Sequence, residues 1–233
     1  MSTSEAFFTA QRVTGVDGCR DGWVAIDLGE GGSLAAVRTA ASLDDLLAGT
    51  ADPQVVGIDM PLGLPAGGWR TADREARALL GPRRSSIFAI PPAAVWQAPT
   101  YGAANRLCRE LTGNGFSAQA WGLRRKLLEA AEYRQRGPHP LYEVHPELSF
   151  RMMAGAPLEH AKHTAAGRAQ RRALLAREGI VMPGDRALGR IAVDVLDAAA
   201  AAWSARRIAA GHACVLPDPP QADPTGRDIA IRY

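Results

Sequence analysis

The stretch that decides the expected fold is Gln11-Arg12-Val13-Thr14-Gly15-Val16-Asp17-Gly18. Val13 and Val16 are β-branched and favour a strand, and the glycines mark its end. The strand therefore ends on a carboxylate, that of Asp17. Burying a carboxylate without a partner is costly, although an aspartate after a strand also commonly opens a turn. This stretch alone leaves both interpretations open.

A second stretch, Gln54-Val55-Val56-Gly57-Ile58-Asp59, repeats the pattern. In both stretches, a glycine lies two positions before an aspartate that closes an apolar strand. The repetition favours a shared purpose over two unrelated turns. We expect Asp17 and Asp59 to lie side by side at one edge of a sheet and to share a cation.

The composition permits a substantial core and sets few limits on partners. The chain has 233 residues, of which 47% are hydrophobic, and a formal net charge of +3. This mild basic bias permits a nucleic-acid partner without requiring one. Of the 27 basic residues, only Lys126 and Lys162 are lysine, and the others are arginine.

Cysteine usage and hydropathy predict a cytoplasmic protein. Cys19, Cys108 and Cys214 form no Cys-x-x-Cys pair, which is typical of a reducing compartment rather than of a disulfide framework or a structural zinc site. No apolar run approaches the roughly 18 residues that a membrane span needs. Residues 1–10 lack the basic and apolar regions of a signal peptide, and we expect them to be a disordered lead-in.

The elements up to Asp59 predict a mixed sheet. Residues 13–18, 23–28 and 33–38 alternate with short turns, which indicates an antiparallel meander of three strands. Ser42 caps a helix over 43–48, and the fourth strand then runs to Asp59. A right-handed crossover through that helix lays strand four parallel to strand one.

The rest of the chain completes one α/β domain over 11–233, with a helical insertion at about 71–136. Residues 141–145 form the fifth strand, which gives the expected order 3-2-1-4-5. The remaining predictions are helices over 71–80 with Thr71 as cap, 101–111, 118–134, 164–178 and 188–210, and candidate edge strands over 213–216 and 228–232.

The late helix carries two acids, in Val193-Asp194-Val195-Leu196-Asp197-Ala198. Positions three apart share a helix face, so Asp194 and Asp197 point the same way. Acids near a helix start also complement the macrodipole, which explains Asp194 better than Asp197. Asp197 lies deeper, in an otherwise apolar run, which favours a functional role.

This order of elements resembles the ribonuclease H-like fold. The resemblance implies that carboxylates from strand one, strand four and the last helix cluster around divalent metal. The late Asp-x-x-Asp pair looks more like the Holliday-junction resolvase branch than ribonuclease H itself. Ribonuclease H also draws a glutamate from its first helix, where this chain offers only Asp44 and Asp45.

A closer resemblance covers most of the chain and rests on six motifs in order. The sequence is similar to the family called domain of unknown function 429, described as predicted ribonuclease H-like nucleases. The resemblance implies this fold and, through it, nuclease activity. The motifs are Gly15-Val16-Asp17-Gly18-Cys19, Gly57-Ile58-Asp59-Met60-Pro61-Leu62-Gly63, Asp73-Arg74-Glu75-Ala76-Arg77, Gly81-Pro82-Arg83-Arg84-Ser85-Ser86, Glu143-Val144-His145-Pro146-Glu147 and Asp194-Val195-Leu196-Asp197-Ala198.

The aspartates suit phosphodiester cleavage. Two Mg²⁺ or Mn²⁺ ions roughly 4 Å apart stabilise charge on the attacking and leaving oxygens, and such hard cations prefer carboxylate ligands. We expect Asp17 to bridge both metals, while Asp59 and Asp197 each hold one. Asp194 would either be a metal ligand or contact the ligands without binding the metal itself.

Two further groups are candidates for the same site. Strand alternation places Glu143, His145 and Glu147 on one side, where Glu143 or His145 would orient water or move a proton. A structural hydrogen-bonded cluster is the alternative. The neighbouring His160, Lys162 and His163 suggest a metal site, but no third ligand lies nearby, which favours a solvated turn. The run Arg83-Arg84-Ser85-Ser86 suits a phosphate, and ordinary surface arginine is its alternative.

Three classes of function remain open from the sequence. The first is a metal-dependent nuclease or other phosphodiester hydrolase acting on nucleic acid. The second is an actin-like or sugar-kinase-type phosphotransferase, in which a strand followed by Asp-Gly begins a phosphate loop. Such kinases need a second related domain and usually exceed roughly 350 residues, which is longer than a single domain. The third is a non-catalytic binding module of the same fold.

Overall fold

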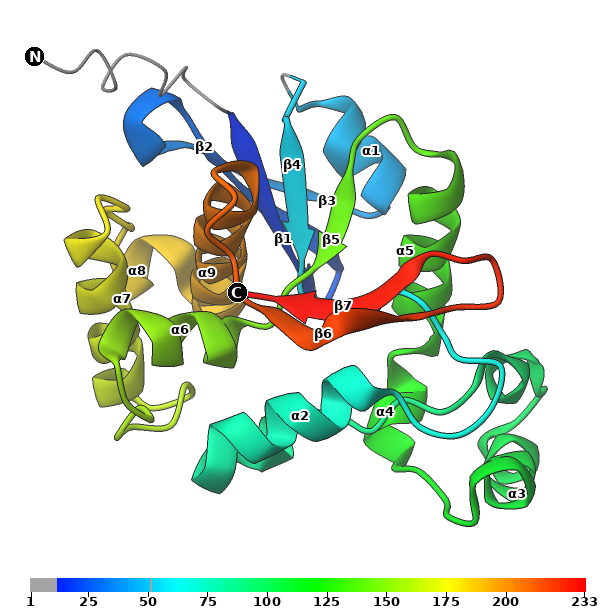
Figure 1. The fold of residues 1–233 in the computed structure, drawn as a ribbon. Helices are drawn as coiled ribbons and strands as arrows, with labels where there is room; N and C mark the ends of the chain where they lie inside the picture. Colours follow the sequence, from blue (N-terminus) through cyan, green and yellow to red (C-terminus); the bar gives the residue numbers. More distant parts are fainter. Residues whose placement is uncertain (1–11, 51) are drawn as a thin grey trace, which may run out of the picture.

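A five-stranded mixed sheet organises the molecule (Figure 1). The computed structural model describes residues 12–50 and 52–233, so the lead-in expected over 1–10 lies outside the described residues. The sheet order is β3-β2-β1-β4-β5, which confirms the predicted order. The strands are β1 (Val13–Cys19), β2 (Gly22–Leu28), β3 (Leu34–Ala40), β4 (Val55–Ile58) and β5 (Leu141–Glu143).

The strand directions follow from the connections. The tight turn between β1 and β2 gives an antiparallel pair with Val13 opposite Leu28, and β3 pairs antiparallel with β2. The helix α1 (Leu43–Ala48) then carries the chain across, so that β4 runs parallel to β1. Ser42 caps α1 by accepting from the amide of Asp45, as expected. Strand β5 is parallel to β4, and the whole arrangement is consistent with a ribonuclease H-like fold.

Helices cover both faces of the sheet. The helix α9 (Ala192–Ala209) lies on one face with α6 (Pro146–Ala154) and α7 (Ala165–Arg177), and its buried alanines pack against apolar side chains of β1 and β2. On the other face, α1 and α5 (Arg124–Arg136) cover Val16, Trp23 and Ile58. The core therefore consists of two apolar layers separated by the sheet.

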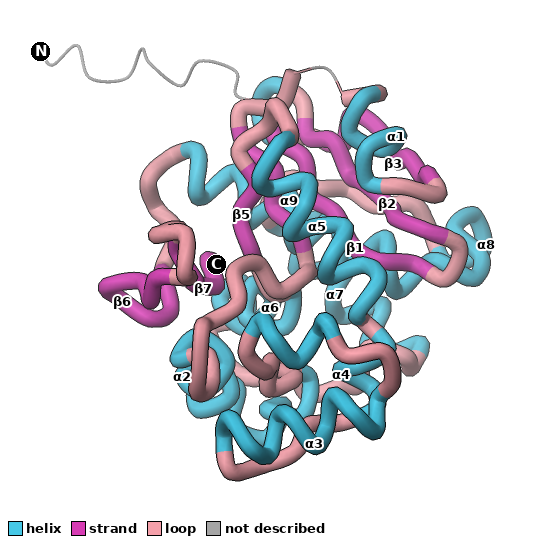
Figure 2. Tube along the Cα trace, turned by 90° about the vertical axis from the view of Figure 1, so that its right-hand side faces the viewer, coloured by secondary structure: helices cyan, strands magenta, loops and turns pink. Residues whose placement is uncertain are grey.

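The first part of the helical insertion lies beyond the C-terminal ends of β1 and β4, and its last helix, α5, returns along the face of the sheet (Figures 1 and 2). It contains α2 (Thr71–Leu80), α3 (Tyr101–Thr112), α4 (Ala118–Gly122) and α5. The helix predicted over 118–134 is divided at Leu123, directly after Gly122, a residue with low helix propensity. Thr71 does not cap α2, because it is already the first helical residue, and its amide donates to Gln221 Oε1.

The last helix begins later than the sequence predicts. The short helix α8 (Asp185–Leu188) and a turn of 3₁₀ helix (Gly189–Ile191) precede α9. Gly189 has a φ of 58°, and this left-handed conformation interrupts the helix. Asp194 consequently lies in the first turn of α9, while Asp197 lies one turn further in.

The two C-terminal strands are not edges of the main sheet, contrary to expectation. The strands β6 (Val215–Ala222) and β7 (Asp228–Arg232) pair with each other in a separate two-stranded sheet. Strand β5 is also shorter than predicted, because Pro146 already opens α6. A bridge between Val144 and Arg232 connects β7 to the segment after β5.

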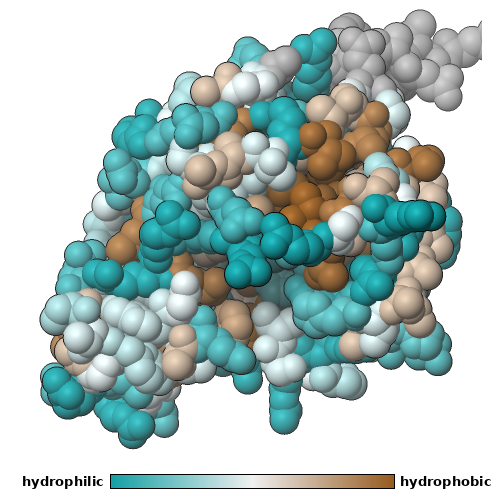
Figure 3. Space-filling view, turned by 180° about the vertical axis from the view of Figure 1, so that it is seen from behind, coloured by the Kyte–Doolittle hydropathy of each residue, from teal (hydrophilic) through white to brown (hydrophobic). Residues whose placement is uncertain are grey.

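The surface seen from behind is mostly hydrophilic, with one apolar area open near its middle (Figure 3). Across the described residues, the large apolar side chains that are exposed belong to separate elements or loops: Val37, Leu111, Met152 and Val181. None of the helices within 12–50 and 52–233 has the length and apolar character required to cross a membrane.

Candidate metal centre

Two glycines allow α9 to pack directly on the backbone of the sheet. A Cβ added at Gly15 would lie 2.0 Å from the amide nitrogen of Ala202, and one at Gly57 would lie 2.7 Å from the carbonyl oxygen of Ala201. Both distances are too short for any side chain larger than hydrogen. Residues two apart on a strand share a face, so Asp17 and Asp59 point to the same side as these glycines. The repeated Gly-x-Asp pattern thus places each aspartate beside α9.

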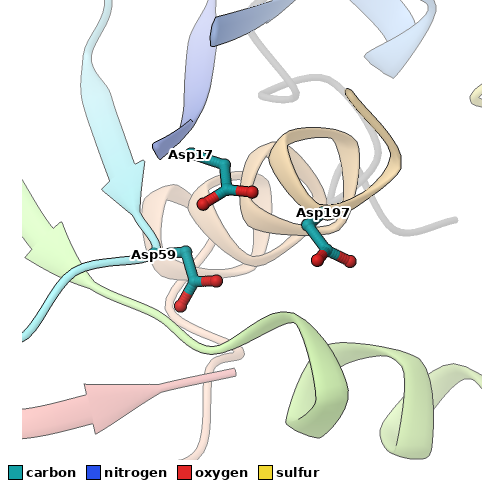
Figure 4. A group of neighbouring side chains, drawn as sticks. All are labelled: Asp17, Asp59 and Asp197. Atoms are coloured by element: carbon teal, nitrogen blue, oxygen red, sulfur yellow. The ribbon is translucent and has the colours of Figure 1, made fainter. Parts of the chain in front are cut away.

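The structure brings Asp17, Asp59 and Asp197 together at this edge (Figure 4). One carboxylate oxygen from each residue lies within 4.8 Å of the others. Asp17 comes from the end of β1, Asp59 follows β4, and Asp197 comes from α9. Asp197 is only 1% exposed and Asp17 is 8% exposed.

The three carboxylates repel one another in a largely buried site. Burial raises the pKa of Asp17 well above its usual value, and the negative charges of Asp59 and Asp197 raise it further. Burial is also the main cause of the raised pKa of Asp59, against which the nearby His145 acts. In the metal-free site, ionisation of these carboxylates is therefore unfavourable, and a bound cation would stabilise their ionised forms.

The donor atoms fit a divalent cation. Asp197 Oδ1 is buried and finds no hydrogen-bond partner among the described residues. Asp17 Oδ1 accepts from the amide of Gly18 at 2.6 Å, which fixes the carboxylate at the strand end. Carboxylate oxygens are the ligands that hard divalent cations prefer. This buried acidic triad is therefore able to bind a metal ion.

The triad forms one wall of a cavity of about 310 Å³. The opposite walls include Phe88 and Leu123 from the insertion and His145 from the start of α6. Asp194 does not belong to the triad. It is partly buried near the start of α9, where burial and the charge of Asp197 raise its pKa.

Glu143, His145 and Glu147 all line this cavity, but they do not form one cluster. Glu143 accepts from Arg70 Nη2 at 2.5 and 2.6 Å and from the amide of Leu62 at 2.6 Å. Burial raises the pKa of Glu143 to about 7, and Arg70 opposes this shift. Glu147 instead pairs with the buried Arg171.

His145 differs from Glu143 and Glu147 because its side chain has no ion-pair partner among the described residues. Its Nε2 lies 3.4 Å from the carbonyl oxygen of Ser86, and its buried Nδ1 has no hydrogen-bond partner in the described part of the chain. The ring reaches close enough to lower the pKa of Asp59. Of this group, His145 is thus the side chain best placed to accept or donate a proton beside the triad.

The run Arg83-Arg84-Ser85-Ser86 lies in a 3₁₀ turn after α2. Arg83 Nη2 donates to the carbonyl oxygens of Leu158 and Glu159 at 3.1 and 3.0 Å, so this guanidinium holds the loop before α7. Arg84 and Ser85 are exposed. Ser86 lines the cavity, and its hydroxyl donates to the carbonyl oxygen of Arg83. A phosphate contact by this run stays a prediction.

Sequence reasoning missed the cations of the site. Lys162 does not lie in a merely solvated turn, because its Nζ pairs with Asp197 Oδ2 at 2.8 Å. Lys126 lines the same cavity and donates to the carbonyl oxygens of Cys19 and Gly22. The signal was present in the composition: the only two lysines of the chain both border this cavity.

A buried ionic cluster beside the cavity was also missed. Arg70 is 1% exposed and pairs with Glu143, while its Nε lies 3.6 Å from Asp73 Oδ1. Asp73 Oδ2 accepts from the amide of Ile90 at 2.8 Å. Because Arg70 immediately precedes the predicted helix, its sequence position resembled that of an ordinary surface residue.

The comparisons with known proteins agree with the sequence motifs. Neither the curated proteins nor the solved structures gave a match. A family model described as "Protein of unknown function (DUF429)" matches residues 15–222, a range that includes all three aspartates of the triad. The chain therefore belongs to the DUF429 family.

Proposed function

We propose that this protein is a divalent-metal-dependent phosphodiester hydrolase that acts on nucleic acid. The observation that carries the proposal is the convergence of Asp17, Asp59 and Asp197 within 4.8 Å. The unpartnered Oδ1 of Asp197 adds a buried acceptor without a hydrogen bond in the described chain. A ribonuclease H-like sheet presents Asp17 and Asp59 at the C-terminal ends of β1 and β4, and α9 brings Asp197 beside them at the wall of a cavity.

The residues would divide the work as follows. Asp17, Asp59 and Asp197 would hold Mg²⁺ or Mn²⁺, which stabilises the charge that develops on the attacking and leaving oxygens. His145, whose Nδ1 has no hydrogen-bond partner among the described residues, would accept a proton from water or donate one to the leaving group. Glu143 would not act directly, because Arg70 and the amide of Leu62 already occupy its carboxylate.

The cavity and its surroundings favour an anionic substrate only once the triad is neutralised. The carboxylates alone would repel a phosphate, so the metal comes before the substrate in this proposal. Lys126 and Lys162 then supply positive charge at the cavity wall. The exposed Arg84 lies beyond the wall and would be available to a longer nucleic-acid strand.

A cleavage screen tests this proposal. Labelled single-stranded and double-stranded DNA and RNA, and a four-way junction, are incubated with the protein in Mg²⁺, Mn²⁺ or a chelator. We expect cleavage with metal by the wild type and none by Asp17→Asn. Asp44→Asn is the matched control, because Asp44 is half exposed, pairs with Arg136 and is not among the residues that line the cavity.

The outcomes separate the remaining classes of function. Cleavage that persists in Asp17→Asn would belong to a contaminant or to another site, and would contradict the proposal. Mn²⁺ binding without cleavage of any substrate would indicate a metal-binding module. Absence of Mn²⁺ binding would show that the triad is not a metal centre.

A further inference from the structure

Lys162 is the one cation that directly contacts a carboxylate of the triad in the described chain. Its Nζ lies 2.8 Å from Asp197 Oδ2. The two side chains differ in exposure, because 36% of Lys162 is open to solvent against 2% of Asp197. The lysine therefore reaches inward from the surface to a carboxylate that cannot move outward.

The same ammonium affects all three aspartates. Besides its contact with Asp197, its charge favours the ionised forms of Asp17 and Asp59. It thus supplies part of the positive charge that a metal ion would bring to the triad. A divalent ion brings twice the charge of a lysine and would repel the ammonium at this short range, so the two cations compete for Asp197.

Lys126 provides a contrast within the same cavity. Its Nζ donates to two backbone carbonyls, those of Cys19 and Gly22, and it stacks over the ring of Trp23 at 5.1 Å. These partners do not bind metal in the proposed site. Lys126 can therefore keep its place when the triad takes up an ion, whereas Lys162 must share Asp197.

Arginine side chains bind backbone carbonyls of the loop on both sides of Lys162. Before Lys162, Arg83 binds the carbonyls of Leu158 and Glu159, and after it Arg168 Nη1 donates to the carbonyl oxygen of His163 at 2.7 Å. These contacts leave the lysine side chain as the part that can move. Displacement of Lys162 would not require the loop to unfold.

We infer that Lys162 is a resident counter-ion for Asp197 that a divalent cation displaces on binding. The freed ammonium then stays at the cavity wall, where it is available to an anionic oxygen of the substrate. The displacement concerns metal binding alone, and its second consequence rests on the proposed nuclease function. In this role Lys162 is a positioning residue that sets the order of events, with metal before substrate.

Titration calorimetry of the full chain with Mn²⁺ tests the displacement. We expect Lys162→Met to bind Mn²⁺ about ten-fold more tightly than the wild type, because the competing ion pair is gone. Lys126→Met removes the same charge from the same cavity and is the matched control, expected within about three-fold of the wild type. Lys162→Arg keeps the competitor and should bind Mn²⁺ no more tightly than the wild type. Circular dichroism checks that each variant is folded.

A chemical readout follows the lysine itself. Because the chain has only two lysines, mass spectrometry can measure how fast each is acetylated by an amine-reactive ester. In the wild type, Mn²⁺ should accelerate acetylation of Lys162 several-fold and leave that of Lys126 unchanged. Equal effects on both lysines, or none, would overturn the inference.

The two proposals fail in different ways. If Mn²⁺ binds but Lys162→Met gains no more affinity than Lys126→Met, the counter-ion role is wrong and the nuclease proposal stands. If Lys162→Met gains affinity but no nucleic acid is cleaved, the counter-ion role stands and the nuclease proposal is wrong. If neither the wild type nor Lys162→Met binds Mn²⁺, both are wrong.

Discussion

Two groups of acidic residues line one cavity and differ in their ion-pair partners. Glu143 and Glu147 each pair with a buried arginine, Arg70 and Arg171 respectively. Asp17 and Asp59 have no arginine partner among the described residues, and Asp197 has only the half-exposed Lys162. At Glu143 the nearest charge opposes the effect of burial on the pKa, whereas at Asp17 the nearest charges add to it.

This contrast separates structural acids from acids with a candidate function. The chain is rich in arginine, and two of its guanidinium groups neutralise the glutamates that border the same cavity. The aspartates at the strand ends have no ion-pair partner of their own among the described residues, at a cost to stability. Such a cost is expected where a ligand supplies the missing charge.

Breaking the compensated group should have the largest effect on stability. Arg70→Met leaves Glu143 buried without its partner, and at pH 8 we expect a loss of about 3–5 kcal/mol in the free energy of unfolding, measured by urea denaturation. Arg84→Met, at an exposed arginine, is the control and should change little. A loss below about 1 kcal/mol would show that Arg70 is not compensating a buried charge.

Changing the packing beneath the triad should come next. Gly15→Ala forces a methyl group into the backbone of α9, and we expect a loss of about 1–3 kcal/mol together with weaker Mn²⁺ binding. Gly67→Ala is the matched control, because no atom lies within 4 Å of an added Cβ there. If a folded Gly15→Ala protein binds Mn²⁺ as tightly as the wild type, the close packing of α9 on Gly15 is not what positions the aspartates of the triad.

Removing charge from the uncompensated group should act in the opposite direction. Asp17→Asn relieves repulsion, and we expect the metal-free protein to gain about 1 kcal/mol of stability while losing the rise in melting temperature that Mn²⁺ gives the wild type. Differential scanning fluorimetry with and without Mn²⁺ measures both effects. If Asp17→Asn melts lower without metal, Asp17 is a structural acceptor for the turn instead.

The smallest expected effect is a pH dependence of the stability that Asp17→Asn gains over the wild type in the absence of metal. Because folding raises the pKa of Asp17, its protonated form favours the folded state. That contribution is complete below the unfolded pKa of about 3.9 and is lost as the pH rises through the folded value. The advantage of Asp17→Asn over the wild type should therefore be full at pH 8 and shrink as the pH falls. A constant difference across this range would contradict the raised pKa.

The sequence was sufficient to predict the sheet and the three aspartates, because both depend on local patterns. The tight turns and the crossover after β3 determine the strand order, and the repeated Gly-x-Asp marks the strand ends. The partner of Asp197 could not be predicted in the same way. Lys162 lies in a loop whose path depends on Arg83 and Arg168, and no local pattern reports such long-range contacts.

The boundaries of the elements were less predictable than their existence, for identifiable reasons. A left-handed Gly189 delays the start of α9, and Pro146 ends β5 early. The C-terminal strands have the composition of sheet edges, but pairing with each other leaves them outside the main sheet. The ion pairs of Glu143 and Glu147 could not be predicted either, because their partners, Arg70 and Arg171, are far away in sequence.

The close packing of Gly15 on α9 also has a consequence for biosynthesis. Strand β1 leaves the ribosome early, whereas α9 is translated only after most of the chain has been made. The nascent protein therefore carries Asp17 and Asp59 without Asp197, and the full set of ligands forms when α9 docks onto the glycines. If the proposed nuclease function holds, this order would leave the growing chain without its complete metal site while it is surrounded by ribosomal and messenger RNA.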